Sequence, residues 1–139
     1  MFKNSEGYAD LTAGAAMSRM MKEYRQQQRK YYAYKNRRKI YVASKYAGDV
    51  EKNVKNAIDY CRRVIEQGHM PIASHLLYPQ MLDDTNPEER KMGQMFGMAL
   101  LGICDEVWVF GEISSGMAEE IREAKTMKKT LRYFGEENA

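Results

Sequence analysis

From residue 40 onward, short continuous apolar runs alternate with segments in which apolar residues recur every three or four positions. The runs are rich in β-branched and aromatic residues and predict strands at 40–43, 70–73, 106–110 and 130–134. The segments between them predict helices over 49–67, from 87 to the third strand, and over 117–128. Such alternation is typical of βαβ units. We therefore expect a small three-layer α/β/α sandwich with a mostly parallel sheet of four to five strands.

Capping residues mark the ends of these helices. Asp49 is placed to cap the first and Gly68 to end it, and Asn86 with Pro87 starts the second. For the first helix the spacing predicts a buried face of Val50, Val54, Ala57, Ile58, Cys61, Val64 and Ile65. For the second it predicts a buried face of Met92, Met95, Phe96, Ala99, Leu100 and Ile103.

The first 38 residues have a different character. Residues 1–10 show no periodicity and predict a flexible start, whereas a helical pattern begins at Thr12, with Thr12 or Asp10 as its cap. Along this helix an apolar stripe is formed by Met17, Met20, Met21 and Tyr24. Residues 25–39 are then basic, with tyrosines between the charges. We interpret 1–38 as a partly helical N-terminal arm and 39–139 as the folded domain.

Charge separates the arm from the domain. Residues 1–39 carry 10 lysines and arginines against 3 acidic residues, whereas residues 40–139 carry 12 against 16. The basic arm has two interpretations. Its cations and tyrosines favour contact with nucleic acid or another anionic partner. Alternatively, it is a solvated helix whose stripe packs on its own domain or on a second subunit. We expect a homo-oligomer, a dimer or larger, because the stripe leaves apolar surface to cover.

Several functional classes are disfavoured. No apolar run is long enough to span a membrane, and no secretory signal is evident. Cys61 and Cys104 form no disulfide framework, which favours a reducing cytoplasm. The two cysteines and two histidines lack the spacing of a zinc site. The phosphate-binding loops of ATPases and of dinucleotide enzymes are absent, so we expect neither metal nor cofactor.

Ligands of such sheets bind beyond the carboxyl ends of the strands, which directs attention to the loops 44–48, 74–86 and 111–116. The turn 111–116 brings Ser114, Ser115 and free backbone amides to a helix start, which suits an anion such as phosphate. The alternative is an ordinary capped helix start without a ligand, which has the same sequence pattern. His75 ends the second strand, and the long loop carries Asp83 and Asp84. The histidine is either a structural hydrogen-bonding group or a proton donor, and the loop either covers a substrate or is plain surface.

Glu120 is the most informative residue of the last helix. It shares one face with Met117, Ile121 and Ala124, whereas Glu119 falls on the other side. A carboxylate on an apolar face needs a partner or a chemical task, because burying an unpaired charge is costly. The alternative is a first-turn glutamate attracted to the helix dipole and reaching solvent.

Four motifs, in this order and spacing, resemble one known family. They are residues 40–44 (IYVAS), 74–75 (SH), 104–111 (CDEVWVFG) and 114–121 (SSGMAEEI). Together they look like the nucleoside 2-deoxyribosyltransferase superfamily, and more narrowly a branch from phages and bacterial mobile elements that is related to deoxynucleoside 5′-monophosphate N-glycosidases. The resemblance covers residues 39–134. It implies a flavodoxin-like fold and chemistry at the N-glycosidic bond of a nucleoside or its 5′-monophosphate.

The resemblance also implies roles for individual residues. The family's nucleophilic glutamate follows a glycine by four residues, which matches Gly116 and Glu120. Its tyrosine beside the sugar matches Tyr41, and its phosphate-binding serine matches Ser114. The catalytic residues expected are thus Glu120, Tyr41 and, as proton donor, His75 or an aspartate of the long loop. The substrate-binding residues expected are Ser44, Gly48, Ser74, Gly111, Ser114, Ser115, Gly116 and Met117.

One position departs from the family. Related enzymes carry an aspartate two helical turns before the aspartate of the third strand, and here that position is Gly97. Asp105 is no obvious replacement, because it should lie at the opposite edge of the sheet. The chain therefore uses another acid, acts on an activated nucleotide, or only binds. The last possibility is a non-catalytic protein of phage or mobile-element origin that senses or sequesters a nucleotide.

Overall fold

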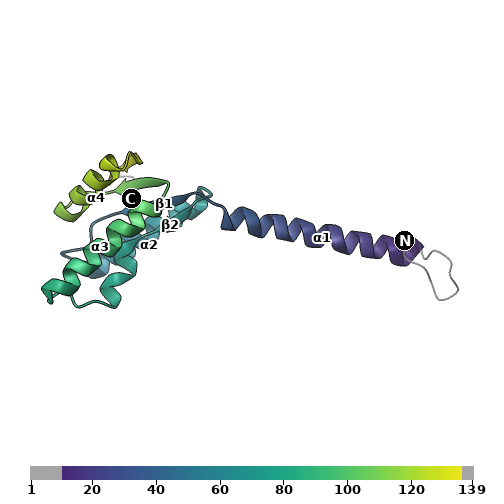
Figure 1. Ribbon diagram of the computed structural model, residues 1–139, viewed down its shortest axis with the longest axis horizontal. Helices are drawn as coiled ribbons and strands as arrows, with labels where there is room; N and C mark the ends of the chain where they lie inside the picture. Colours follow the sequence, from purple (N-terminus) through teal and green to yellow (C-terminus); the bar gives the residue numbers. More distant parts are fainter. Residues whose placement is uncertain (1–10, 136–139) are drawn as a thin grey trace. The chain divides into compact units, whose positions relative to one another are not determined.

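The computed structural model describes residues 11–135, with Leu11 described by its backbone alone. The chain divides into two compact units, Met1–Arg37 and Arg38–Ala139. The described part of the first unit is α1 (Leu11–Lys35), one continuous helix of 25 residues (Figure 1). This confirms the predicted N-terminal helix. The flexible start expected for residues 1–10 and the cap expected at Asp10 lie outside the described residues. The alternative cap, Thr12, is wrong, because α1 already includes Leu11 and Thr12 lies inside the helix.

The second unit alternates strands and helices, as predicted. Its elements are β1 (Lys39–Ala43), α2 (Val50–Glu66), β2 (Met70–Ile72), α3 (Pro87–Ile103), β3 (Glu106–Phe110), α4 (Ser115–Thr126) and β4 (Thr130–Phe134). Two short 3₁₀ turns, η1 (Ser74–Leu76) and η2 (Tyr78–Gln80), give structure to the long loop after β2. The four strands form one all-parallel sheet in the order β2-β1-β3-β4.

This strand order places the carboxyl ends of β1 and β3 at a switch point. From β1 the chain moves outward to β2, and from β3 it moves outward on the other side to β4. The central strands pair in register, with Ile40 opposite Glu106 and Ala43 opposite Val109. The loops that follow β1 and β3 therefore diverge above the middle of the sheet, which is where open α/β sheets bind ligands.

Helices cover both faces of the sheet. On one face, Tyr60 and Val64 of α2 pack against Ile40, Trp108 and neighbouring strand residues. On the other face, residues of α3 and α4 pack against the alternate side chains of β1 and β3; this second core comprises Tyr41, Ala43, Leu101, Cys104, Val107, Val109, Met117, Ile121 and Ala124. Successive strand residues point to opposite faces. The predicted three-layer sandwich is confirmed.

The predicted helix ends are also found. The Asp49 carboxylate accepts a hydrogen bond from the backbone amide of Lys52, and Asn86 caps α3 in the same way. Gly68 follows α2 with a φ of +88°, a left-handed conformation that favours glycine. Good capping chemistry is local in sequence, which explains why these boundaries are readable from the sequence alone.

The predicted buried face of α3 is wrong except for Leu100, which is partly buried and packs against the core. The other residues of that face are exposed, and the helix instead turns Gly97 and Leu101 toward the sheet; the exposed residues are Met92, Met95, Phe96, Ala99 and Ile103. Apolar residues occur on several sides of α3, so spacing alone does not select the buried one. The side of α3 that faces the sheet is the one with small residues, because glycine lets a helix backbone approach its neighbours closely.

The predicted face of α2 needs a similar correction. Val50, Ile58 and Ile65 are exposed, whereas Tyr60 is buried and stacks on Phe110 with ring centroids 4.5 Å apart. An aromatic ring buries more apolar area than an aliphatic side chain and gains from stacking. The helix is therefore rotated so that Tyr60, rather than Ile58, contacts the sheet.

Candidate active site

A cavity of about 350 Å³ opens on the α3 and α4 side of the sheet. Its walls come from segments that are distant in sequence: Tyr41 of β1, the loop after β1, the turns after β2, one side of α3 and the start of α4. All three loops singled out from the sequence, 44–48, 74–86 and 111–116, contribute residues. The strand order thus produces one shared cavity at the predicted edge of the sheet.

Glu120 lies in the wall of this cavity and is 7% exposed. It is held there by the packing of α4, because Met117, Ile121 and Ala124 on the same face belong to the core. Its atom Oε2 is buried and has no hydrogen-bond partner among the residues that the structure describes. A buried carboxylate oxygen without a partner is unusual in a folded protein and marks Glu120 as a candidate functional residue.

The surroundings of Glu120 change its protonation. Burial raises the pKa of Glu120 to about 7, although interaction with the Tyr41 hydroxyl lowers it. Burial and the nearby Glu120 charge raise the pKa of Tyr41 well above its usual value, so this phenol keeps its proton. At neutral pH the carboxyl group therefore exists in both forms, with a phenolic hydroxyl beside it.

Tyr41 is fixed by a buried hydrogen bond of 2.8 Å between its hydroxyl and the hydroxyl of Ser74. Gly97 of α3 lies against this pair. A Cβ added at Gly97 would be 3.4 Å from Ser74 Oγ and 3.7 Å from Tyr41 Oη. A side chain longer than alanine would therefore occupy the cavity beside the pair. Gly97 is the position at which the sequence resemblance predicts an aspartate, and here it carries no side chain.

His75 lies between the loop after β1 and Glu120 and contacts both. Its Nε2 atom lies 3.8 Å from Glu120 Oε1, and its ring stacks on Tyr46 with centroids 5.2 Å apart. Burial lowers the pKa of His75, so the imidazole is neutral at pH 7. The contact is therefore a polar one between a neutral ring and a carboxyl group, and lowering the pH does not turn it into an ion pair, because Glu120 takes up a proton before His75 does.

The start of α4 is the capped helix N-terminus expected from the sequence. Ser114 caps the helix, and its hydroxyl accepts a hydrogen bond from the amide of Met117 at 3.3 Å. Ser115 and Gly116 follow and line the cavity. The partial positive charge at a helix N-terminus favours an anion at this place.

The structure brings together most, but not all, of the predicted site residues. Those that line this cavity are Tyr41, Ser74, His75, Ser114, Ser115, Gly116 and Glu120. Ser44 and Met117 are buried, and Met117 belongs to the core. Gly48 lines neither this cavity nor the second one described below. Of the two loop aspartates, Asp84 lines the cavity and Asp83 does not.

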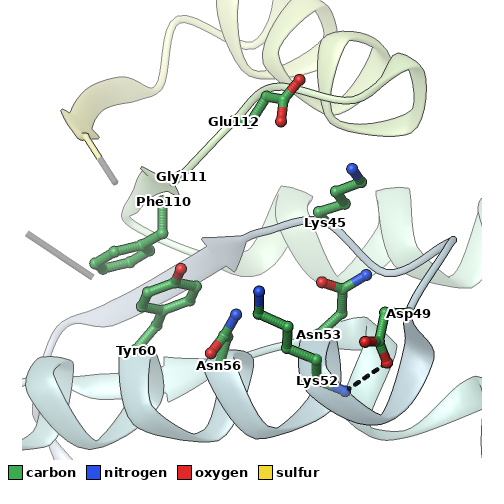
Figure 2. Close-up of a pocket in the computed structure, with 9 residues that line it drawn as sticks. All are labelled: Lys45, Asp49, Lys52, Asn53, Asn56, Tyr60, Phe110, Gly111 and Glu112. Carbon is green, nitrogen blue, oxygen red and sulfur yellow. Dashed lines mark hydrogen bonds between the residues drawn. The ribbon is translucent and has the colours of Figure 1, made fainter. Parts of the chain in front are cut away.

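Gly111 belongs to a second cavity, of about 410 Å³, on the α2 side (Figure 2). Figure 2 shows its lining residues: Lys45, Asp49, Lys52, Asn53, Asn56, Tyr60, Phe110, Gly111 and Glu112. The Asn53 amide donates hydrogen bonds to the carbonyls of Tyr46 and Ala47, at 2.9 and 3.0 Å. Tyr46 and Ala47 line the first cavity, so one short loop separates the two cavities and Asn53 holds it.

Sequence reasoning missed several lining residues. Tyr46 and Tyr78 come from loops, and Arg90 and Gln94 come from α3. The sequence pattern could have identified the α3 residues, because Arg90, Gln94 and Gly97 recur at helical spacing and form one polar face that includes a small residue. The loop tyrosines had no comparable signal, since their place depends on the path of the loop.

Other features of the described residues bear on the chemistry. Residues 11–135 contain no group of three or more metal-ligating side chains and no helix long and apolar enough to cross a membrane. Cys61 and Cys104 are free. Burial raises the pKa of each thiol to about 11, so both stay protonated at neutral pH. Neither thiol lines the cavity.

The comparisons agree with this architecture. A solved structure of a 2-deoxyribosyltransferase from the psychrotolerant bacterium Bacillus psychrosaccharolyticus is similar with a TM-score of 0.60 and 17% identity. The similarity covers 70% of this chain and 72% of that one, and at this identity it shows a shared fold. No curated protein matches the sequence. A family model described as a domain of unknown function, DUF7768, matches residues 38–134, and the chain belongs to this family.

Proposed function

We propose that this protein cleaves or transfers the N-glycosidic bond of a nucleoside or nucleoside 5′-monophosphate, with Glu120 as nucleophile. The observation that carries the proposal is the buried Glu120 carboxyl group, which lies in the wall of an open cavity and has one oxygen without a hydrogen-bond partner among the described residues. The fold shared with a 2-deoxyribosyltransferase supports the same chemistry. A buried carboxyl group that forms a covalent sugar intermediate is a known solution to this type of reaction.

In the proposed reaction, the ionised Glu120 oxygen attacks the anomeric carbon of the sugar. The carbon–nitrogen bond breaks, and its electron pair leaves with the base, which takes up a proton. The products of this step are a glycosyl ester on Glu120 and the free base. Water or a second base then attacks the same carbon and restores the carboxylate. Tyr41, which contacts both Glu120 and Ser74, orients the nucleophile.

The proton for the leaving base comes from a group other than the family's aspartate. Asp84 lines the cavity from the long loop and is the acid we propose. His75 is neutral at pH 7 and lies 3.8 Å from Glu120, so it suits the second step, in which the attacking water must lose a proton. The two groups would then divide the acid and base roles.

Two features of the cavity suit a phosphate on the substrate. Ser115 and Gly116 lie at the start of α4, and Arg90 lines the cavity from α3. A helix N-terminus and a guanidinium are both good partners for phosphate oxygens. We therefore expect nucleoside 5′-monophosphates to bind more tightly than the corresponding nucleosides.

Base release from a panel of nucleosides and 5′-monophosphates tests the proposal. Glu120→Gln should lower the rate by about 10³-fold or more, because the amide cannot form the glycosyl ester. Glu123→Gln is the matched control on the same helix, since Glu123 does not line the cavity. No base release from any compound, or full activity in Glu120→Gln, would end the proposal.

A second function, binding without turnover, is favoured by Gly97. The family's acid is absent at this position, and the space beside Tyr41 is open. A sensing or sequestering protein would show nucleotide-induced thermal stabilisation with no product after long incubation. Stabilisation of equal size in Glu120→Gln, without base release by either protein, would establish this alternative.

A further inference from the structure

The helix α1 carries a heptad pattern that the proposed function does not use. Met17, Met20, Tyr24, Gln27, Tyr31 and Tyr34 follow each other at alternating steps of three and four residues. We call these six positions the seam. All six side chains are exposed, and Arg37 lies over the Tyr34 ring at 4.9 Å. Apolar residues at this spacing line one narrow side of a helix, which is the signature of a coiled coil.

The basic residues of α1 leave the seam free. Arg19, Lys22, Arg25 and Arg29 follow one another at helical spacing and fall on the opposite side of the helix. The helix can therefore pack along the seam while these four cations stay in water. Docking onto a globular surface favours a broader apolar face.

The charges that border the seam select the orientation of a partner helix. On one border lie Glu23 and Lys30, and on the other lies Lys35. In a parallel pair of α1 helices, Lys30 of one copy would face Lys35 of the other, which is repulsive. In an antiparallel pair, Glu23 of each copy faces Lys30 of the other, which is attractive. Charge complementarity therefore favours the antiparallel arrangement.

We propose that α1 binds a second copy of this chain as an antiparallel two-stranded coiled coil. In this register Met17 lies opposite Tyr34, Met20 opposite Tyr31, and Tyr24 opposite Gln27. Methionine sulfur packs favourably against aromatic rings, so the layers that pair Met17 with Tyr34 and Met20 with Tyr31 stabilise this arrangement. Gln27 is the one polar seam position in this stretch and weakens the pair. The proposal uses no residue of the cavity and stands independently of the proposed function.

Two adjacent glutamines offer a matched test. Gln27 is a seam position, whereas Gln26 points away from the seam, and both are exposed in a helix. Sedimentation equilibrium of the full chain should give a concentration-dependent dimer. Gln27→Leu should lower its dissociation constant at least about tenfold, because two leucines replace two glutamines in the seam. Gln26→Leu adds the same residue to the same helix and should leave the dissociation constant unchanged.

A charge swap tests the orientation. Lys30→Glu should weaken the dimer, because it places two glutamates opposite each other in the antiparallel pair. Glu23→Lys should weaken it for the same reason with lysines. The double variant should restore the wild-type dissociation constant, since each pair is attractive again. Lys30→Glu would instead strengthen a parallel pair, by facing Lys35.

Three results would overturn the proposal. One is a monomer at every concentration, which would indicate that the seam packs within its own chain or binds another molecule such as nucleic acid. Another is an equal effect of Leu at positions 26 and 27. The third is a dimer that none of these substitutions changes, which would place the interface elsewhere. Circular dichroism of each variant verifies that the helix content is retained.

Discussion

At the scale of single residues, Glu120 links stability to pH. Burial raises its pKa to about 7 from the usual 4.5, so the folded protein holds this proton more tightly than the unfolded chain does. The stabilisation is complete below pH 4.5 and is lost as the pH rises to about 7. The ionised carboxylate that a nucleophile requires is thus the form that destabilises the fold.

We expect Glu120→Gln to be more stable than the wild type at pH 8, by about 2 to 3 kcal/mol, because the amide removes a buried charge. Near pH 4.5 the two proteins should unfold with similar free energies. Urea unfolding at both pH values measures this. A wild type as stable as the variant at pH 8 would show that Glu120 is well solvated when ionised.

The same ionisation sets an expected activity profile. If Glu120 is the nucleophile, the acidic limb of the kcat/KM profile for base release should follow its ionisation and increase with pH toward about 7, because only the carboxylate attacks. Initial rates across pH 5 to 9 measure it. A rate that is unchanged between pH 5 and 7 would contradict a role for the ionised form.

Residue-level reasoning from the sequence was accurate where the signal was local. Glu120 was placed on the inner face of α4 because that helix has one clear apolar side. The hydrogen bond between Tyr41 and Ser74, and the stacking of Tyr46 on His75, were not readable. Each joins segments about 30 residues apart, and such contacts depend on how strands and loops assemble.

At the scale of elements, the strands and capped helix starts were predictable, whereas the rotation of two helices was not. A strand shows its burial through a continuous apolar run, and a cap is a local hydrogen bond. The rotation of α3 depends on which side approaches the sheet, and glycines rather than large apolar residues mark that side.

Substitutions on the two sides of α3 test its observed rotation. Leu101→Ala should cost about 2 to 5 kcal/mol, because Leu101 is fully buried against the sheet. Met95→Ala should cost less than about 1 kcal/mol, since Met95 is 48% exposed. Thermal or urea unfolding of both variants measures the difference. Similar costs for the two would mean that α3 is rotated differently.

The start of α2 supports the loop between the two cavities. Asn53→Ala removes two hydrogen bonds to the carbonyls of Tyr46 and Ala47 and should cost about 1 to 3 kcal/mol. Amide hydrogen exchange in residues 45–48 should become faster. Asn56→Ala, one turn along the same helix, is the control. Unchanged exchange in Asn53→Ala would show that other contacts hold the loop.

At the scale of the whole molecule, both cores are built from residues of the second unit alone. We therefore expect a fragment of residues 38–139 to fold cooperatively, with a melting temperature within about 5 °C of the full chain. Thermal unfolding followed by circular dichroism at a concentration below dimerisation measures this. A fragment that unfolds far earlier would show that α1 contributes to the stability of the domain.

The bare backbone at Gly97 has a consequence for selectivity. At the position where the sequence resemblance predicts an acidic side chain, this protein presents only a helix surface next to the paired hydroxyls of Tyr41 and Ser74. Under the proposed function, a compound that is bulkier at this point, or one that brings its own proton donor, should be accepted here and excluded by an enzyme with an aspartate at the same position. Screening should therefore include modified nucleotides as well as the common ones.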